Sequence, residues 1–93
     1  MAAFMTRIEL HNATWQDYEN LHRQMEAAGF SRTIQGGDGV WYKLPTAEYV
    51  IYTNLTIDQV RALAKGCANS TGKNSSVLTC QYTNAAWNNL DRA

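Results

Sequence analysis

The chain has 93 residues, which is enough for one domain with a single hydrophobic core and too few for two. Eight Lys and Arg residues balance eight Asp and Glu residues, so the chain lacks the overall positive charge that drives non-specific binding to nucleic acid. The first ten residues are interrupted by Arg7 and Glu9, and no segment approaches the roughly 20 apolar residues of a membrane span. We therefore expect a cytoplasmic protein with no membrane partner.

The first quarter of the chain predicts a strand followed by a helix. Residues Phe4–Leu10 alternate between two faces, as in a half-buried strand. Thr14, with Asp17 three residues later, predicts the N-cap of a helix, and Gly29 is expected to end that helix because glycine readily adopts positive φ. Apolar residues recur between these limits at helical spacing and predict one buried stripe: Tyr18, Leu21, Met25 and Ala28.

The middle of the chain predicts a hairpin and a further strand. Residues 30–35 and 40–44 are rich in β-forming residues, and the glycine cluster 36–39 between them predicts a tight turn. This cluster lacks the spacing of a phosphate-binding loop and precedes a strand instead of a helix, which excludes a nucleotide cradle. Pro45 predicts an edge or a bend before residues 47–53, which form either a separate strand or the continuation of the preceding one.

The last third of the chain predicts a second helix and a final strand. Thr56 and Gln59 form a capping box, and the buried stripe of the helix is expected at Val60, Leu63, Ala64 and Cys67. Residues 69–76 predict a polar loop, and residues 76–83 predict a strand. The tail, residues 84–93, predicts either a short helix or a segment that packs on the sheet. Both cysteines, Cys67 and Cys80, are expected to be small buried side chains.

The predicted order β-α-β-β-α-β is typical of a ferredoxin-like fold. We therefore expect an α+β, two-layer sandwich in which two helices cover one face of an antiparallel sheet. Residues 1–93 would form one such domain.

Several segments also resemble a known family. They are ELHNATWQDYENLHRQMEAAGFSRTI, WYKLPTAEY, the helix start L-T-x-x-Q-V and the late TGK…SVL strand. Together they resemble GhoS and the small bacterial proteins grouped with it, the antitoxins of type V toxin-antitoxin pairs. The resemblance extends from about Arg7 to Leu90.

The resemblance implies a ferredoxin-like fold related to small CRISPR-associated nucleases. It also implies an endoribonuclease whose RNA partner is the messenger that encodes a membrane-acting toxin. GhoS has a basic residue on its first helix, and His22 and Arg23 are its counterparts here. The departure from the GhoS pattern is large, so no other functional position is carried over.

Cleavage of RNA without a metal requires a general base, a general acid and a cation near the phosphate. Histidine is the best acid or base at neutral pH, and the chain has only His11 and His22. We take these two residues, together with Arg23 and Arg32, as the catalytic candidates. Alternatively, His11 is a solvated loop residue and His22 seals the edge of the core.

Contacts with RNA or with a protein partner are expected at Arg7, Trp41, Tyr42 and Lys43, because aromatic faces beside basic groups can stack unpaired bases. Alternatively, one aromatic residue covers the core and the other lies on the sheet surface.

A metal-dependent site would need converging carboxylates, and Glu9 and Glu48 are the candidates. Arg7 and Lys43 can neutralise these residues as cross-strand pairs. We therefore expect neither a metal nor a cofactor.

A second functional hypothesis is a non-catalytic module that binds a protein partner or a second copy of itself. Its basis is the zero net charge, together with three Trp and five Tyr residues in a small domain. Self-association would use a sheet edge or the hairpin.

Overall fold

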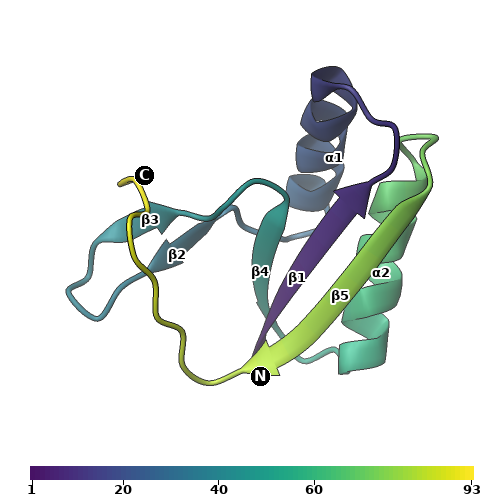
Figure 1. Ribbon diagram of the computed structural model, residues 1–93. Helices are drawn as coiled ribbons and strands as arrows, with labels where there is room; N and C mark the ends of the chain where they lie inside the picture. The colour runs from purple at the N-terminus through teal and green to yellow at the C-terminus, as the bar shows by residue number, and fades with distance from the viewer.

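The computed structural model describes residues 1–93 and shows an α+β fold (Figure 1). The elements in chain order are β1 (Ala2–Leu10), α1 (Trp15–Ala27), β2 (Thr33–Gln35), β3 (Trp41–Lys43), β4 (Glu48–Thr53), α2 (Ile57–Asn69) and β5 (Ser75–Tyr82). Antiparallel strands form a main sheet in the order β4-β1-β5, and β2 pairs with β3 in a separate hairpin. Neither helix has the length and apolar character needed to cross a membrane.

The hydrophobic core lies between the main sheet and the two helices, which cover the same face (Figure 1). Alternate residues of β1 point into it, and Phe4, Ile8 and Leu10 are all buried, as the period of two predicted. The helices contribute their predicted stripes, with Leu21 and Met25 of α1 fully buried. The opposite face of the main sheet, here called the open face, is not covered by a helix.

The two predicted helix starts are confirmed. Thr14 and Thr56 each accept a hydrogen bond from the backbone N–H three residues later, and each capping box is complete. Gly29 follows the last turn of α1 with φ of 100°, the left-handed conformation expected at that position.

The expectation of a single antiparallel sheet is wrong at residues 33–35 and 41–43, which pair only with each other as the hairpin β2–β3. Ser31 pairs with Val50 at the edge of the main sheet, but regular pairing in β2 begins only at Thr33 and is made with β3. Between these points the Ser31 hydroxyl accepts a hydrogen bond from the Thr33 N–H at 3.1 Å. This local bond bends the chain at Arg32, so the hairpin leaves the main sheet as an arm.

The C-terminal segment, residues 84–93, forms no helix and does not simply lie on the main sheet. It crosses from the end of β5 to the hairpin (Figure 1). The backbone N–H of Lys43 donates to Asp91 O at 2.8 Å, and the N–H of Ala93 donates to Trp41 O at 3.0 Å. This segment therefore hydrogen-bonds to the backbone groups at the outer edge of β3. The sequence of the tail alone did not predict this pairing.

Pro45 lies in the turn before β4, as expected, and Ala47 takes a positive φ there. Cys67 is buried as expected, but Cys80 is exposed, because its position in β5 places it on the open face opposite Met5.

Candidate functional site: the His11 end of the open face

Arg7 and Glu9 lie on the open face of β1, because they alternate with the buried residues of that strand. The strand register places Arg7 beside Glu48 on β4 and beside Leu78 on β5. Arg7 also helps to line a shallow depression of about 260 Å³, together with Glu9, Ser76, Val77 and Leu78. The central strand therefore presents one cation and one carboxylate, two residues apart, at an open surface.

His11 extends this row beyond the end of β1. Its Nε2 atom lies 3.0 Å from the Ser76 hydroxyl and 3.6 Å from Glu9 Oε1. Its backbone N–H donates to Asn74 O at 2.8 Å, so the main chain of this residue is tied to the loop before β5. His11 is therefore not isolated, because a carboxylate and a hydroxyl lie against its ring.

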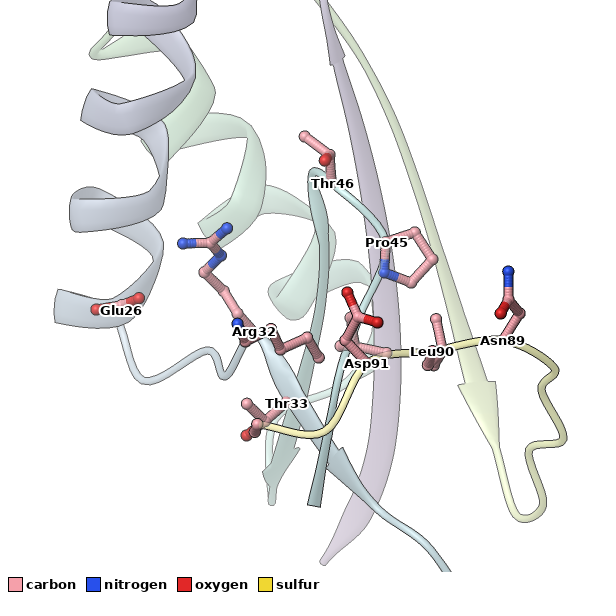
Figure 2. A pocket seen from close by; sticks show the side chains of 11 residues that line it. Glu26, Arg32, Thr33, Pro45, Thr46, Asn89, Leu90 and Asp91 are labelled. Carbon is pink, nitrogen blue, oxygen red and sulfur yellow. The ribbon is translucent and has the colours of Figure 1, made fainter. Parts of the chain in front are cut away.

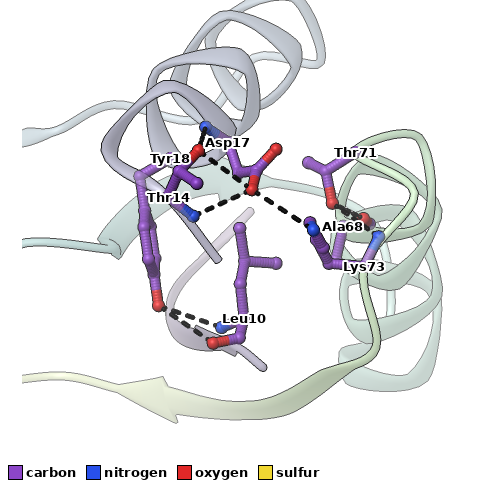
Figure 3. Close-up of polar contacts among 7 residues, drawn as sticks. All are labelled: Leu10, Thr14, Asp17, Tyr18, Ala68, Thr71 and Lys73. Atoms are coloured by element: carbon purple, nitrogen blue, oxygen red, sulfur yellow. Dashed lines mark hydrogen bonds and ion pairs between the residues drawn. The ribbon is translucent and has the colours of Figure 1, made fainter. Parts of the chain in front are cut away.

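The main chain next to His11 is fixed by contacts made before and after this residue in the sequence (Figure 3). The Tyr18 hydroxyl accepts a hydrogen bond from the Leu10 N–H at 3.0 Å and donates to Leu10 O at 3.4 Å. Asp17, at the start of α1, forms an ion pair with Lys73 in the α2–β5 loop at 3.8 Å. These contacts connect the chain segments before and after His11 to α1 and to the loop that carries Asn74.

Asp17 is stabilised in its ionised form. The hydrogen bond from the Thr14 backbone lowers the pKa of this carboxyl most, and the Thr14 hydroxyl and Lys73 lower it further. The α1 cap and its ion pair therefore remain charged at neutral pH, where they position the His11 end of the sheet.

The charges of the open face partly compensate one another. Arg7 Nη1 lies 3.9 Å from Glu48 Oε1, so the two residues form one of the cross-strand pairs expected from the sequence. Glu9 and Glu48 do not form a joint carboxylate site, since Glu48 lies beside Arg7 and Glu9 lies beside His11. No cluster of three or more His, Cys, Asp or Glu side chains is arranged to hold a metal ion.

His22 lies in the core and is only 5% exposed. Its Nδ1 atom is 2.6 Å from the Tyr49 hydroxyl, and the two rings are tilted with centroids 5.8 Å apart. Burial lowers the pKa of His22, and the nearby Arg32 charge lowers it further, whereas Glu19 and Glu26 oppose this shift. Burial raises the pKa of the Tyr49 phenol, so neutral forms of both side chains are favoured.

Arg23 lies on the exposed side of α1, where it donates a hydrogen bond to Asn20. His22 precedes it by one residue but points into the core. These two residues, selected through the family resemblance, therefore do not face the same surface.

Arg32 and Lys43 share a different pocket, of about 620 Å³, between α1, the hairpin and the C-terminal segment (Figure 2). Figure 2 shows the Arg32 side chain extending between α1 and β4, whereas Asp91 lies on the C-terminal segment beside Pro45. Glu26 and Asp91 also line this pocket, so its two cations are matched by two carboxylates. It has no histidine, and this leaves it without an acid or base that titrates near neutral pH.

The hairpin aromatics have different environments. Trp41 is 51% exposed, whereas Tyr42 packs against Trp87 with ring centroids 5.5 Å apart. The Tyr42 hydroxyl donates to Asp38 Oδ2 at 3.0 Å, and this hydrogen bond raises the pKa of the phenol. Tyr42 therefore joins the C-terminal segment to the arm, and Trp41 is the hairpin aromatic that remains accessible.

Thus neither the four catalytic candidates nor the two basic contact candidates, Arg7 and Lys43, converge on one site. His11 and Arg7 belong to the open face, Arg32 and Lys43 to the pocket at the base of the arm, His22 to the core and Arg23 to the outer face of α1.

Sequence reasoning missed Ser76 as a partner of His11 and missed Tyr52 and Tyr82 on the open face. The alternation of β4 and β5 carries a signal for these residues, but only the strand register shows which of them are neighbours.

Comparison of the chain with models of known protein families and with curated proteins finds no match.

Proposed function

We propose that this chain is a cytoplasmic, ferredoxin-like endoribonuclease that cleaves RNA at the His11 end of its open face. The observation that carries the proposal is the contact between His11 and Glu9, 3.6 Å apart, on the row that also contains Arg7. The resemblance of the sequence to GhoS-type antitoxins supports the RNA substrate and suggests a toxin messenger as the target. The strand order β4-β1-β5, with Ser31 pairing on the outer side of β4, supports the ferredoxin-like topology.

The three side chains supply the groups that metal-free RNA cleavage requires. Glu9 accepts the proton of the ribose 2′-hydroxyl as its oxygen forms a bond to phosphorus. His11 acts as the general acid and gives a proton to the departing 5′-oxygen as the phosphorus–oxygen bond breaks. Arg7 stabilises the additional negative charge on the phosphate during this exchange. The products are a 2′,3′-cyclic phosphate and a 5′-hydroxyl, and proton transfer from Glu9 to His11 restores the starting state.

His11→Gln and Glu9→Gln test these roles on a panel of fluorophore-labelled AU-rich and structured RNAs. We expect each substitution to lower the cleavage rate by about 10²- to 10⁴-fold, the usual contribution of general acid–base catalysis. Both residues are exposed, so folding should be preserved and can be checked by circular dichroism.

Arg23→Gln is the matched control, because Arg23 is exposed and lies away from the open face on α1. We expect this variant to cleave at the wild-type rate. Loss of cleavage in Arg23→Gln but not in His11→Gln would move the site to α1. A wild-type protein that leaves every RNA intact, with and without Mg²⁺, would refute the endoribonuclease proposal.

The β5 edge favours a second candidate, a non-catalytic module that pairs with its own copy. β5 is the outer strand of the main sheet, and its eight residues include neither a charged side chain nor proline. Such groups usually protect exposed edges from pairing, and here Lys65 contacts only Ser75 at the start of the strand. Antiparallel pairing of two β5 strands would make one continuous six-stranded sheet.

This second candidate predicts a dimer that a charge on β5 disrupts. Cys80→Lys should shift sedimentation equilibrium toward the monomer, whereas Trp41→Ala tests an interface on the hairpin instead. A wild-type chain that remains monomeric at high micromolar concentration would eliminate self-association.

A further inference from the structure

A groove of about 380 Å³ lies between the hairpin, the C-terminal segment and the end of the open face opposite His11. Four aromatic residues from four parts of the chain contribute to its lining: Trp41, Tyr52, Tyr82 and Trp87. None of its 13 lining residues is charged. The groove therefore differs from the depression beside Arg7 and from the pocket of Arg32 and Lys43, both of which contain charged groups.

The floor of the groove is set by the strand register. Ala3 on β1 lies directly beside Tyr52 on β4 and directly beside Tyr82 on β5. The small side chain of Ala3 leaves space between the two tyrosines on this face. Tyr52 is 67% exposed although it is a large aromatic residue, so one wall of the groove is accessible from solvent.

The lining favours a flat, neutral ligand with hydrogen-bonding edges. Aromatic side chains offer faces for stacking, and Thr83 and Asn84 add a hydroxyl and an amide at the groove. A charged ligand would lose its hydration without gaining an ion pair. An unpaired nucleobase has both of the favoured properties, because its faces stack and its edges carry donors and acceptors.

The groove and the proposed cleavage site lie on the same face and along the same strand. Ala3 and Arg7 are four residues apart on β1, which corresponds to about 13 Å in an extended strand. An RNA strand lying along β1 can therefore place a phosphate at Arg7 while one of its bases enters the groove.

We propose that the groove formed by Trp41, Tyr52, Tyr82 and Trp87 is a base-binding subsite that selects single-stranded RNA. This inference rests on the proposed function and adds a specificity determinant to it. Single strands are selected because a paired base presents neither its face nor its Watson–Crick edge to the protein.

The test uses a fluorescein-labelled, single-stranded octamer of 2′-O-methyl RNA, which lacks the attacking hydroxyl and so is bound without being cleaved. Anisotropy titrations of the full chain measure the Kd. Tyr52→Ala should weaken binding by about 5- to 150-fold, the range that corresponds to loss of one stacked base. Tyr52→Phe keeps the ring and should bind nearly as well as the wild type. The same octamer in a duplex should bind more weakly.

Trp15→Ala is the matched control, since Trp15 is 74% exposed at the start of α1, away from the groove. It should leave the Kd unchanged. Equal affinities for the wild type and Tyr52→Ala would overturn the inference, even if Arg7→Gln weakened binding. Unchanged RNA binding combined with loss of self-association in Tyr52→Ala would assign the groove to a protein contact and would also overturn it.

The two proposals fail in different ways. A protein that cleaves RNA through His11 but binds the octamer independently of Tyr52 retains the proposed function and loses the base subsite. A protein that cleaves no RNA but binds the octamer in a Tyr52-dependent way retains the subsite and loses the catalytic proposal.

Discussion

The two faces of the main sheet use the same strands for different purposes. On the helix side of β1, Phe4 and Ile8 are nearly inaccessible, whereas Arg7 and Glu9 on the other side are exposed. The same division separates the two histidines, because His22 is held in the core and His11 lies at the end of the open face. The residues that stabilise the fold and the residues of the candidate site therefore lie on different faces of the sheet. Substitutions on the open face should have little effect on stability, and the packing of the core should not depend on them.

The largest difference in the free energy of unfolding is expected between the variants Ile8→Ala and Leu78→Ala. Ile8 is 1% exposed and packs in the core, so its truncation should lower the free energy of unfolding by about 2–5 kcal/mol. Leu78 is 71% exposed on the open face, and its truncation should change that free energy by no more than about 0.5 kcal/mol. Urea denaturation followed by circular dichroism measures both values. Similar losses in the two variants would show that the open face is covered in solution.

A smaller difference in the free energy of unfolding is expected between variants of two tyrosines of β4. Tyr49→Phe removes the hydroxyl that contacts His22 Nδ1 and leaves a buried polar atom without its partner. We expect the free energy of unfolding to fall by about 1–3 kcal/mol. Tyr52→Phe removes an exposed hydroxyl from the opposite face and should change it by less than about 0.5 kcal/mol.

A double-mutant cycle tests whether the buried contact is responsible. Replacing His22 by Leu together with Tyr49→Phe removes both polar partners, so the double variant should lose less stability than the two single losses combined. Additive losses would mean that the two side chains act independently in the core.

Local signals in the sequence predicted most of the elements correctly. The alternation of β1, both capping boxes and the glycine after α1 depend on residues within a few positions of one another, and the structure confirms each of them. The bend at Arg32 was missed because residues 30–35 are all acceptable in a strand. Their division between two sheets depends on which strand each one meets, Val50 for Ser31 and Lys43 for Thr33.

The candidate site was less predictable than the fold. His11 and Arg7 were both selected as residues, but the contact of His11 with Ser76 joins positions 65 residues apart. His22 satisfied the chemical criterion for a catalyst, and its burial against Tyr49 arises from packing between α1 and β4. Residue type therefore identified the candidates, whereas the strand register and the packing decided which of them share a surface.

The smallest expected effect is the contribution of His22 to the pH dependence of folding stability, because only one group changes its proton binding. Its pKa in the folded state is lowered from the ordinary 6.5, chiefly by burial and also by Arg32. Between the lowered and the ordinary pKa, the unfolded chain binds more protons than the folded chain, so stability increases with pH in that interval. The contribution is complete above pH 6.5 and is lost as the pH falls towards the folded-state pKa.

Urea denaturation at a series of pH values below 7 should therefore show a loss of stability on acidification that is reduced in His22→Gln. Glutamine does not titrate, and its amide can still hydrogen-bond to the Tyr49 hydroxyl. Taking the difference between the two proteins at each pH removes the contribution of groups that both share, such as Asp17. Parallel curves for the two proteins would show that proton binding at His22 does not oppose folding, and the buried histidine would then be protonated as readily as an exposed one.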